Sequence, residues 1–440
     1  MIDTILILVA LLAFGNLIQG YLLFKLWKKL KERPIIVGRT SKPKSKQKKK
    51  EKTGNEKPRG KPKGSAGGGR KNPETYDEVV HVPHSEACSV CEKRLNEHDS
   101  YPRALIDFEF IPRGIKLVYK QYVLHRGKCS ACKKVSAPHV SEYLPYARIR
   151  NNLMAWVAYK RIVLGNPLNK IQDEIHQFFG EKISDPTLFS IIDRLGRKFD
   201  KEYKEIREKI RKSKIVNTDE TGVPINGDNW WAWEFLTKTL VVFELAKYRN
   251  HKVPKEFFGE DFTGVLICDF FSSYNCLTYK QQKCLVHLLR IFERDLDKHP
   301  ENEELKKFIS EVLDALMPAI EKSKKEKKAL PDVKQATEQA LNKIFSKTYE
   351  SKFVQRKAKR LKKRLPDMLR FLEDPDIPPH NNDGERVFRP FAVCRKIIGC
   401  FRSEVGARNH LKMYSLYITC KLQKVNFTDF LTGKDDISLE

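Results

Sequence analysis

Acidic residues are scarce in this sequence of 440 residues: 56 Asp and Glu stand against 84 Lys and Arg, which leaves a formal net charge of +28. Trp27 to Lys71 holds 18 Lys and Arg against three Glu, and the rest of the chain still carries +13. This excess favours a polyanionic partner, with nucleic acid ahead of an anionic membrane surface. Cysteine is also sparse, and ten in a chain of this length exclude a disulfide scaffold. Hydrophobic residues, at 40%, suffice for real cores, and the length predicts about two to four domains.

Of two N-terminal segments, the first has no charged residues and the second has few apolar residues. Residues 4–24 contain no charged residue and are followed by several lysines, which predicts a signal anchor that spans a bilayer. A self-associating helix that buries an apolar face between protomers is the competing interpretation. Residues 30–73 are rich in Lys, Gly, Pro and Ser and too poor in apolar residues to fold alone. They predict a disordered basic linker that adds salt-sensitive affinity for DNA or RNA, or one that only keeps the chain soluble.

Four of the cysteines form two CxxC pairs, Cys88 with Cys91 and Cys129 with Cys132. Each pair presents two thiolates from one tight turn, and four thiolates satisfy tetrahedral zinc with no open position. The spacing therefore predicts one structural Zn2+, with buried free thiols as the alternative. Between the pairs, ALIDFEF and KLVYKQYVL predict two short strands.

The segment after the cysteines is helical by pattern. Two predicted helices, Leu168 to Phe179 and Pro186 to Leu195, are separated by the turn GEKISD, with Asp185 as the expected N-cap. This outline is typical of a helix-turn-helix whose second helix enters the DNA major groove, although any two packed helices produce it.

Three acids far apart in the sequence stand at the ends of predicted elements. KIVNT predicts a strand that ends at Asp219, and GVLIC predicts a buried strand that ends at Asp269, with a meander of two further strands between them. If the two strands are neighbours, both carboxylates reach the same ions. Glu385 lies in a basic helix expected to begin near Asn382. The alternative there is a solvated helix in which Glu385 pairs with Arg389 at i+4.

These motifs together carry a resemblance to a known family. Asp219 in TDETG, Asp269 in CDFFSSYN, Cys284 and His287 in CLVHLLR, and Glu385 in NNDGERVFRPFAVCRKIIGCFRSE resemble the DDE transposases of the insertion sequence 66 family. With the CxxC pairs and the basic approach to them, the similarity covers roughly residues 57–425. The family usually begins with a leucine-rich, coiled-coil-like segment, and this chain differs by having the apolar run at residues 4–24.

The resemblance implies an α/β fold with a ribonuclease H-like catalytic core and a helical insertion. A small zinc-binding domain and a helical, helix-turn-helix-like DNA-binding domain would precede the core. The predicted boundaries are 1–29 for the apolar N-terminal helix, 30–73 for the linker, 74–141 for the zinc domain, 142–212 for the helical domain, 213–294 and 376–425 for the two parts of the core, 295–375 for the insertion, and 426–440 for the tail.

Cutting and joining DNA is in-line displacement at phosphorus, which two Mg2+ or Mn2+ ions about 4 Å apart can promote. Hard cations prefer carboxylate oxygens, so Asp219, Asp269 and Glu385 are the expected ligands. Water would act as the first nucleophile and a freed 3′-hydroxyl as the second. Four cations of the same segment as Glu385 are expected to position phosphates: Arg386, Arg389, Arg395 and Lys396. Cys284 and His287 are expected to lie beside Asp269, with a role in packing or in metal binding.

The expected function is a transposase that acts on double-stranded DNA, both the ends of its own element and the target. A homo-oligomer on DNA is expected, as is a cytoplasmic, nucleoid-associated location, with a membrane anchor at residues 4–24 as the open alternative. Two rival functions remain. One is a ribonuclease H-like nuclease that cleaves without strand transfer, and the other is a membrane-tethered, catalytically inactive, zinc-stabilised DNA-binding protein.

Overall fold

The structure is a computed structural model that describes residues 72–138, 140 and 148–439. The apolar run at residues 4–24 lies outside this range, as does nearly all of the basic linker, so neither expectation is tested. Among the described residues, no helix combines the length and the apolar character needed to cross a bilayer.

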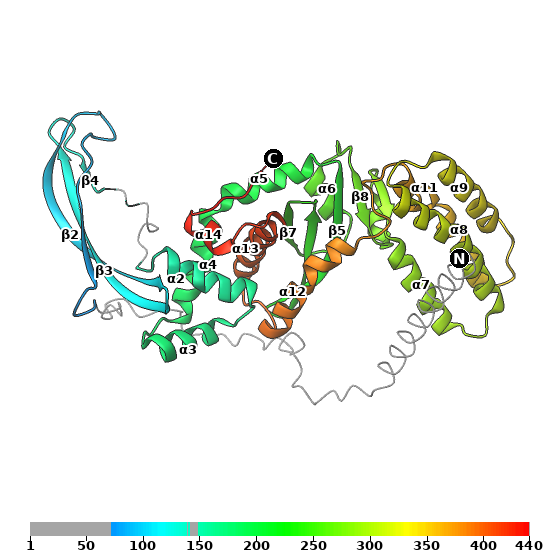
Figure 1. The fold of residues 1–440 in the computed structure, drawn as a ribbon, viewed down its shortest axis with the longest axis horizontal. Coiled ribbons are helices and arrows are strands. Elements are labelled where there is room, and N and C mark those ends of the chain that lie inside the picture. The colour runs from blue at the N-terminus through cyan, green and yellow to red at the C-terminus, as the bar shows by residue number, and fades with distance from the viewer. Residues whose placement is uncertain (1–71, 139, 141–147, 440) are drawn as a thin grey trace, which may run out of the picture. The chain divides into compact units, whose positions relative to one another are not determined.

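The cysteine region is built on a long antiparallel hairpin (Figure 1). Its strands, β2 (Leu95–Ile111) and β3 (Gly114–Cys129), pair along almost their whole length and are longer than the predicted pair. Both strands extend beyond the predicted segments. Alternating residues on one face of the hairpin, among them Leu105, Tyr122 and Leu124, are buried together. Two short strands complete this sheet: β1 (Glu78–Val82), parallel to β3, and β4 (Val135–Ser136), antiparallel to it.

Helices follow, as the sequence predicts: α2 (Asn151–Ala158), the π-helical turn η2 (Tyr159–Val163), α3 (Leu168–Phe179), α4 (Asp185–Lys198) and α5 (Asp200–Arg211). The bounds of α3 are those predicted, and Gly180 ends it with a φ of +68°. Asp185 is the first helical residue of α4 rather than its N-cap, because Ser184 is extended and occupies the cap position. α3 and α4 pack through buried residues such as Ile171, Ile175 and Leu188.

The five-stranded sheet has the order β7-β6-β5-β8-β9. Its strands are β5 (Ile215–Ile225), β6 (Asp228–Leu236), β7 (Val241–Ala246), β8 (Val265–Cys268) and β9 (Lys280–Lys283), with α6 (Lys252–Phe258) and η3 (Ser272–Cys276) in the connections. The predicted meander of β5, β6 and β7 is present, and Asn226 and Gly227 form its first turn with positive φ. β8 lies parallel to β5, so the two acid-bearing strands are neighbours. This mixed α/β arrangement is consistent with a ribonuclease H-like core.

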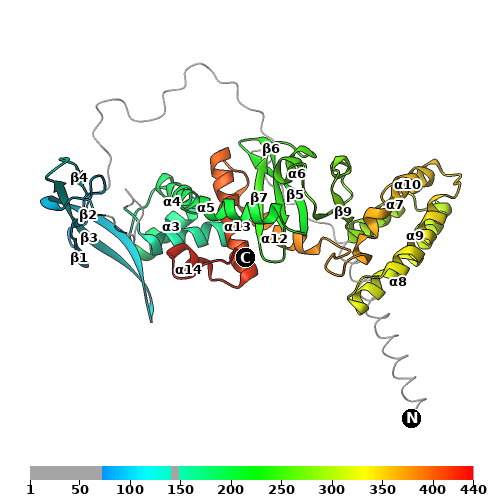
Figure 2. The same cartoon turned by 90° about the horizontal axis from the view of Figure 1, so that it is seen from above.

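Two late helices cover the sheet. α12 (Asn382–Ile398) packs on β5, and α13 (Glu404–Gln423) packs on β7, followed by α14 (Phe427–Thr432) (Figures 1 and 2). The hydroxyls of Ser415 and Thr419 accept hydrogen bonds from backbone N–H groups of β7, which satisfies the edge of the sheet. One hydrophobic core joins the sheet, α12 to α14, the helices α2 to α5 and the tip of β2.

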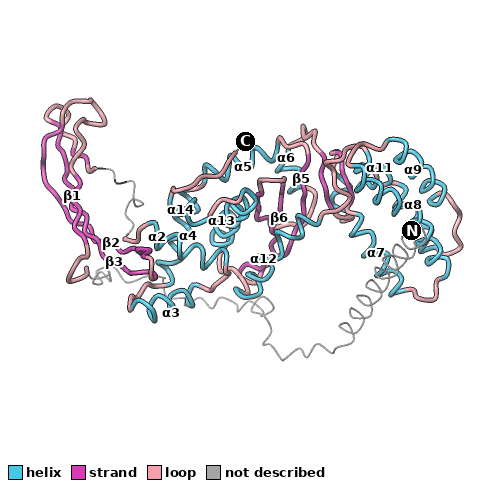
Figure 3. Tube along the Cα trace, in the orientation of Figure 1, coloured by secondary structure: helices cyan, strands magenta, loops and turns pink. Residues whose placement is uncertain are grey.

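The chain between β9 and α12 is almost entirely helical (Figure 3). It forms α7 (Leu285–Lys298), α8 (Glu303–Glu326), α9 (Pro331–Phe345), α10 (Lys352–Lys362), α11 (Leu365–Met368) and the 3-10 turn η4 (Arg370–Leu372). These helices bury a second core of their own, which meets the sheet at β8 and β9.

Candidate active site

Asp219 and Asp269 lie level with each other on adjacent parallel strands. Asn217 of β5 is in register with Ile267 of β8, and each aspartate follows two residues later. Asp219 does not end its strand as predicted, because β5 continues to Ile225 through its pairing with β6. It stands where the pairing with β8 stops, so the sheet opens beside it. Asp269 follows the last residue of β8, as predicted.

Asp219 occupies a negative environment. Burial, followed by the charge of Glu220, raises its pKa to about 7, and Asp269 and Glu385 add smaller contributions in the same direction. Among the described residues, its carboxylate accepts one hydrogen bond, from the backbone N–H of Glu220 at 2.8 Å. Glu220 points to the opposite face of β5, where Arg249 and the Tyr274 hydroxyl each donate to it at 2.7 Å. Asp269 and Glu385 therefore both lie within electrostatic range of Asp219, which has no ion pair with a cation among the described residues.

Asp269 is held by one side-chain and one backbone hydrogen bond. Its Oδ1 accepts a hydrogen bond from the N–H of Phe271 at 2.8 Å, and its carbonyl accepts one from the ammonium of Lys283 at 3.1 Å. Lys283 is fully buried at the end of β9 and also contacts the thiol of Cys268. These two bonds leave Asp269 Oδ2 without a hydrogen-bond partner among the described residues.

Glu385 comes from the first turn of α12, as predicted, but its partner is not Arg389. Arg290 of α7 donates two hydrogen bonds to its carboxylate, at 2.7 and 3.1 Å, and His287 Nε2 lies 3.6 Å from Glu385 Oε1. The bidentate pairing with Arg290 lowers the pKa of Glu385. Glu385 is therefore ionised and already beside cations.

Asn381 fixes α12 against β5. It is completely buried and precedes the helix, but its side chain makes no capping bond there. Instead its Oδ1 accepts a hydrogen bond from Asn217 at 2.7 Å, and its Nδ2 donates to the carbonyl of Thr218 at 2.9 Å. Its own N–H donates to the Cys284 thiol at 3.2 Å. One side chain thus ties the start of α12 to the residues that precede Asp219 and to the start of α7.

Cys284 and His287 lie where the start of α7 meets the start of α12. Cys284 is buried at the N-cap of α7, and His287 lies one turn later beside Glu385. The Cys284 thiol accepts from a backbone amide, and burial raises its pKa, which is the behaviour of a neutral packing group. His287 Nδ1 is buried with no hydrogen-bond partner among the described residues.

The donor set suits a hard divalent cation, since it consists of carboxylate oxygens and one of them is buried without a cation. The carboxylates are not gathered to ion-sharing distance. Among the described residues, the only group of three or more potential ligands whose donor atoms all lie within 4.8 Å of one another is the cysteine set. Both oxygens of Glu385 are instead engaged by Arg290 of α7.

The four predicted phosphate-binding cations of α12 differ in their surroundings. Arg386, Arg389 and Lys396 are exposed, and Arg386 has only a loose contact of 3.8 Å with Asp383. Arg395 is half-buried, and its guanidinium donates to Thr221 Oγ1 at 2.9 Å and to the carbonyl of Gly222. Arg395 therefore fastens α12 to β5.

Sequence reasoning missed a fourth carboxylate, Glu234. It lies opposite Asp219 on β6, on the same face of the sheet, and is completely buried. Neither of its oxygens has a hydrogen-bond partner among the described residues, and burial raises its pKa well above the usual range. Its position in the alternating run WWAWEFL, inward-facing in a hydrophobic strand, is the signal that could have found it.

The four cysteines of the CxxC pairs converge at the base of the hairpin. The Sγ atoms of Cys88 and Cys132 are 3.6 Å apart, and those of Cys91 and Cys129 are 3.4 Å apart. Tetrahedral zinc with bonds of about 2.3 Å requires sulfur separations of about 3.8 Å. The N–H of Cys132 is the main cause that lowers the pKa of Cys129 to about 6, which favours a thiolate.

The two cysteine turns are built alike. In each, the N–H of the first cysteine donates to a carbonyl five residues later, and its carbonyl accepts from the N–H four residues later. The residue after the second cysteine has a left-handed backbone in both, with φ of 58° at Glu92 and 61° at Lys133. The residues present therefore fit one zinc ion.

Comparison with known proteins gives a family and two relatives. The family model described as "Transposase IS66 family" matches residues 147–409, more than half of the chain. The "Uncharacterized protein y4qI" of Sinorhizobium fredii is 23% identical over 400 residues, which cover 82% of this chain and 71% of the relative. The "Uncharacterized protein y4jO" of the same organism is 27% identical over 148 residues, which cover 34% of this chain and 46% of the relative.

Proposed function

Because the chain belongs to the IS66 family of transposases, an enzyme family that catalyses phosphoryl transfer on DNA, we propose that it cleaves and joins DNA at the ends of its own element through Asp219, Asp269 and Glu385. The observation that carries this proposal is the level placement of the two aspartates on neighbouring parallel strands. Further support comes from Asn381, which ties the helix of Glu385 to the strand of Asp219, and from the effect of Glu385 on the pKa of Asp219.

The three acids would hold divalent cations, Mg2+ or Mn2+, with Asp269 the best placed to contact two of them. Such cations activate the attacking oxygen and stabilise the leaving oxygen of an in-line displacement at phosphorus. Glu385 would join the aspartates by exchanging its bond to Arg290 for this role. Arg290 would then be free to pair with a DNA phosphate, which suits a bidentate guanidinium.

The residues around the acids would orient them. Asn381 sets the position of α12, Lys283 holds the backbone of Asp269, and His287 stands beside Glu385. Arg386, Arg389 and Lys396 are exposed on α12 and would position the DNA backbone by charge. Arg395 would act indirectly by fixing α12 to β5.

The remaining segments would serve DNA binding. The pair α3 and α4 would act as a helix-turn-helix with α4 in the major groove, and the four cysteines would hold one structural zinc that stabilises the hairpin. Two element ends must be brought together for joining, so the chain would act as a homo-oligomer on DNA.

A plasmid joining assay tests the function. The full-length protein, Mg2+ and a donor duplex with a free 3′-hydroxyl end from the terminal repeat of the element are incubated with supercoiled plasmid. Joined products are expected from the wild type, and Asp269→Asn should abolish them while it retains DNA binding. Cleavage without joining would support a nuclease instead. Full activity of Asp269→Asn would overturn the assignment of the acids.

A further inference from the structure

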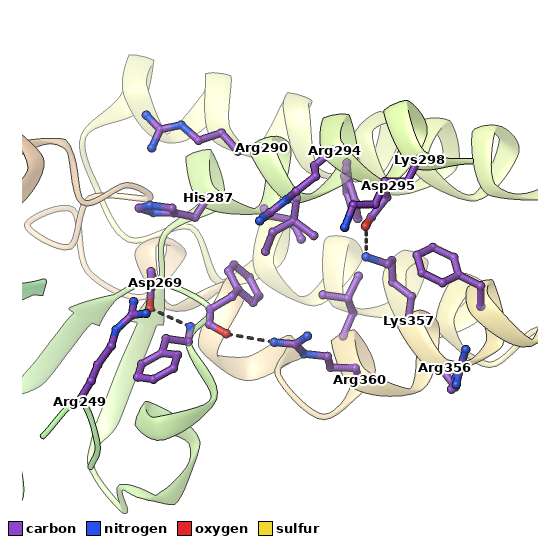
Figure 4. A pocket seen from close by; sticks show the side chains of 17 residues that line it. Arg249, Asp269, His287, Arg290, Arg294, Asp295, Lys298, Arg356, Lys357 and Arg360 are labelled. Carbon is purple, nitrogen blue, oxygen red and sulfur yellow. Dashed lines mark hydrogen bonds and ion pairs between the residues drawn. The ribbon is translucent and has the colours of Figure 1, made fainter. Parts of the chain in front are cut away.

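A cationic pocket of about 830 Å3 adjoins Asp269 and extends away from it between α7 and α10 (Figure 4). Two rows of side chains define this basic pocket: Arg290, Arg294 and Lys298 on α7, and Arg356, Lys357 and Arg360 on α10. Arg249 adds a further cation near Asp269, whereas the lining contains only two acids, Asp269 and Asp295.

The row on α7 follows the helix geometry. Its three cations recur every fourth residue and therefore lie along one face, about 12 Å from first to last. Arg356 and Arg360 are likewise one turn apart on α10. Figure 4 shows Arg360 and Lys357 on the wall opposite the α7 row, with Asp269 at one end. A strand that keeps the stacked spacing of duplex DNA, about 3.4 Å per nucleotide, would match the α7 row over about three nucleotides.

The protein neutralises part of this charge. Arg290 pairs with Glu385, and Arg249 pairs with Glu220. Lys357 pairs with Asp295, and Arg360 donates one hydrogen bond to the carbonyl of Phe270 at 3.0 Å. Arg294 and Lys298 are exposed and make no ion pair with any residue that the structure describes. The pocket therefore offers unpaired positive charge to an external anion, such as a nucleic-acid strand that extends from Asp269 into the pocket.

Shape and lining favour one DNA strand over a duplex. The volume lies within the range of roughly 300–1,000 Å3 typical of ligand pockets, whereas a duplex needs a broad open surface. Phe271 and Phe353 also line the pocket and are only partly buried. Aromatic side chains among cations are the combination by which proteins bind single strands, through stacked bases and paired phosphates.

Resting on the proposed transposase function, we propose that the basic pocket binds an unpaired stretch of about three nucleotides of the strand that adjoins the scissile phosphate. The strand leaves the acids at Asp269 and runs between the two rows. Its phosphates contact Arg294 and Lys298 on one side and Arg360 on the other. The helical insertion thereby becomes part of the substrate site.

Equilibrium binding by fluorescence anisotropy tests this inference with the full-length chain in EDTA, where no cleavage occurs. The probes are a blunt duplex and the same duplex with about six unpaired nucleotides on one strand. The double variant Arg294→Ala/Lys298→Ala should lose on the order of tenfold affinity for the tailed probe, and its salt dependence should fall by about 1.4 in slope. Its affinity for the blunt duplex should stay at the wild-type value.

A matched control removes the same charge elsewhere on the helical cluster. Lys324 and Lys325 are exposed near the end of α8 and do not line the pocket, so Lys324→Ala/Lys325→Ala should bind both probes as the wild type does. Arg294→Lys should restore most of the affinity lost on Arg294→Ala, because charge is conserved.

Equal losses on tailed and blunt probes would overturn the inference in favour of a duplex-binding surface, and unchanged binding of the tailed probe would remove the pocket from DNA binding. Cleavage assays with Asp269→Asn separate this result from the proposed function. If cleavage depends on Asp269 while the pocket variants bind the tail normally, only the pocket assignment fails. If cleavage survives Asp269→Asn while the pocket variants lose the tail, only the catalytic assignment fails.

Discussion

Asp219→Asn removes a charge that the folded protein accommodates poorly in the absence of a cation. Burial and neighbouring acids raise the pKa of Asp219 from 3.8 to about 7. One pKa unit corresponds to about 1.4 kcal/mol, so ionised Asp219 lowers the free energy of unfolding by about 4 kcal/mol. Asparagine has the same shape, carries no charge, and can still accept the hydrogen bond from the N–H of Glu220.

Proton binding sets the direction of the effect. Because folding raises this pKa, the folded protein binds the proton more tightly than the unfolded chain. The contribution of Asp219 to the free energy of unfolding therefore falls as pH rises from about 4 to about 7 and is constant above that range. The free energy of unfolding of Asp219→Asn should not show this fall with rising pH. Its gain over the wild type should be small near pH 4 and approach about 4 kcal/mol near pH 8.

Urea unfolding followed by circular dichroism, across this pH range in EDTA, measures the gain directly. Mg2+ should then stabilise the wild type near pH 8 and have much less effect on Asp219→Asn, because the cation neutralises the same carboxylate. An equal gain at both pH values, or equal stabilisation of both proteins by Mg2+, would refute the reasoning.

Three further predictions concern the neighbours of this carboxylate and the cysteine site. Asn381→Ala leaves two buried hydrogen-bonding groups of β5 unpaired and should lower the free energy of unfolding by about 2–5 kcal/mol, measured by urea unfolding. Arg290→Gln releases Glu385 and should tighten Mn2+ binding measured by calorimetry; weaker binding would contradict the exchange proposed for this pair. Cys129→Ser should reduce bound zinc from one ion per chain to a small fraction of that, measured by elemental analysis of the purified protein, whereas Cys276→Ser, an exposed cysteine outside the cluster, should not.

The order of elements around the acids could be predicted because each signal is local. β8 is a short apolar run, the turn at Asn226 and Gly227 is a hairpin dipeptide, and α12 begins where the asparagines predict. The sequence alone could not predict that β5 and β8 are adjacent, because strand order depends on packing between distant segments. The structure supplies that order, and with it the level placement of the two aspartates. The domain boundaries drawn from the sequence stay predictions.

The partners of the acids could not be read from local patterns. Glu385 pairs with Arg290, which is 95 residues away in sequence, instead of Arg389 one turn along its own helix. Asn381 has the residue type of a helix cap, yet a buried amide is stabilised more by two bonds to β5 than by one to its own helix. Glu234 is a charged residue in a hydrophobic strand, and only the register between β6 and β5 places it opposite Asp219.

The most direct test of a shared cation site is a crystal structure of the protein soaked in Mn2+, with anomalous scattering recorded at the manganese edge. An anomalous peak is predicted between the carboxylates of Asp219 and Asp269, together with a Glu385 side chain that has left Arg290. At saturating Mn2+, density without any peak at these aspartates and with Glu385 still paired to Arg290 would contradict the account.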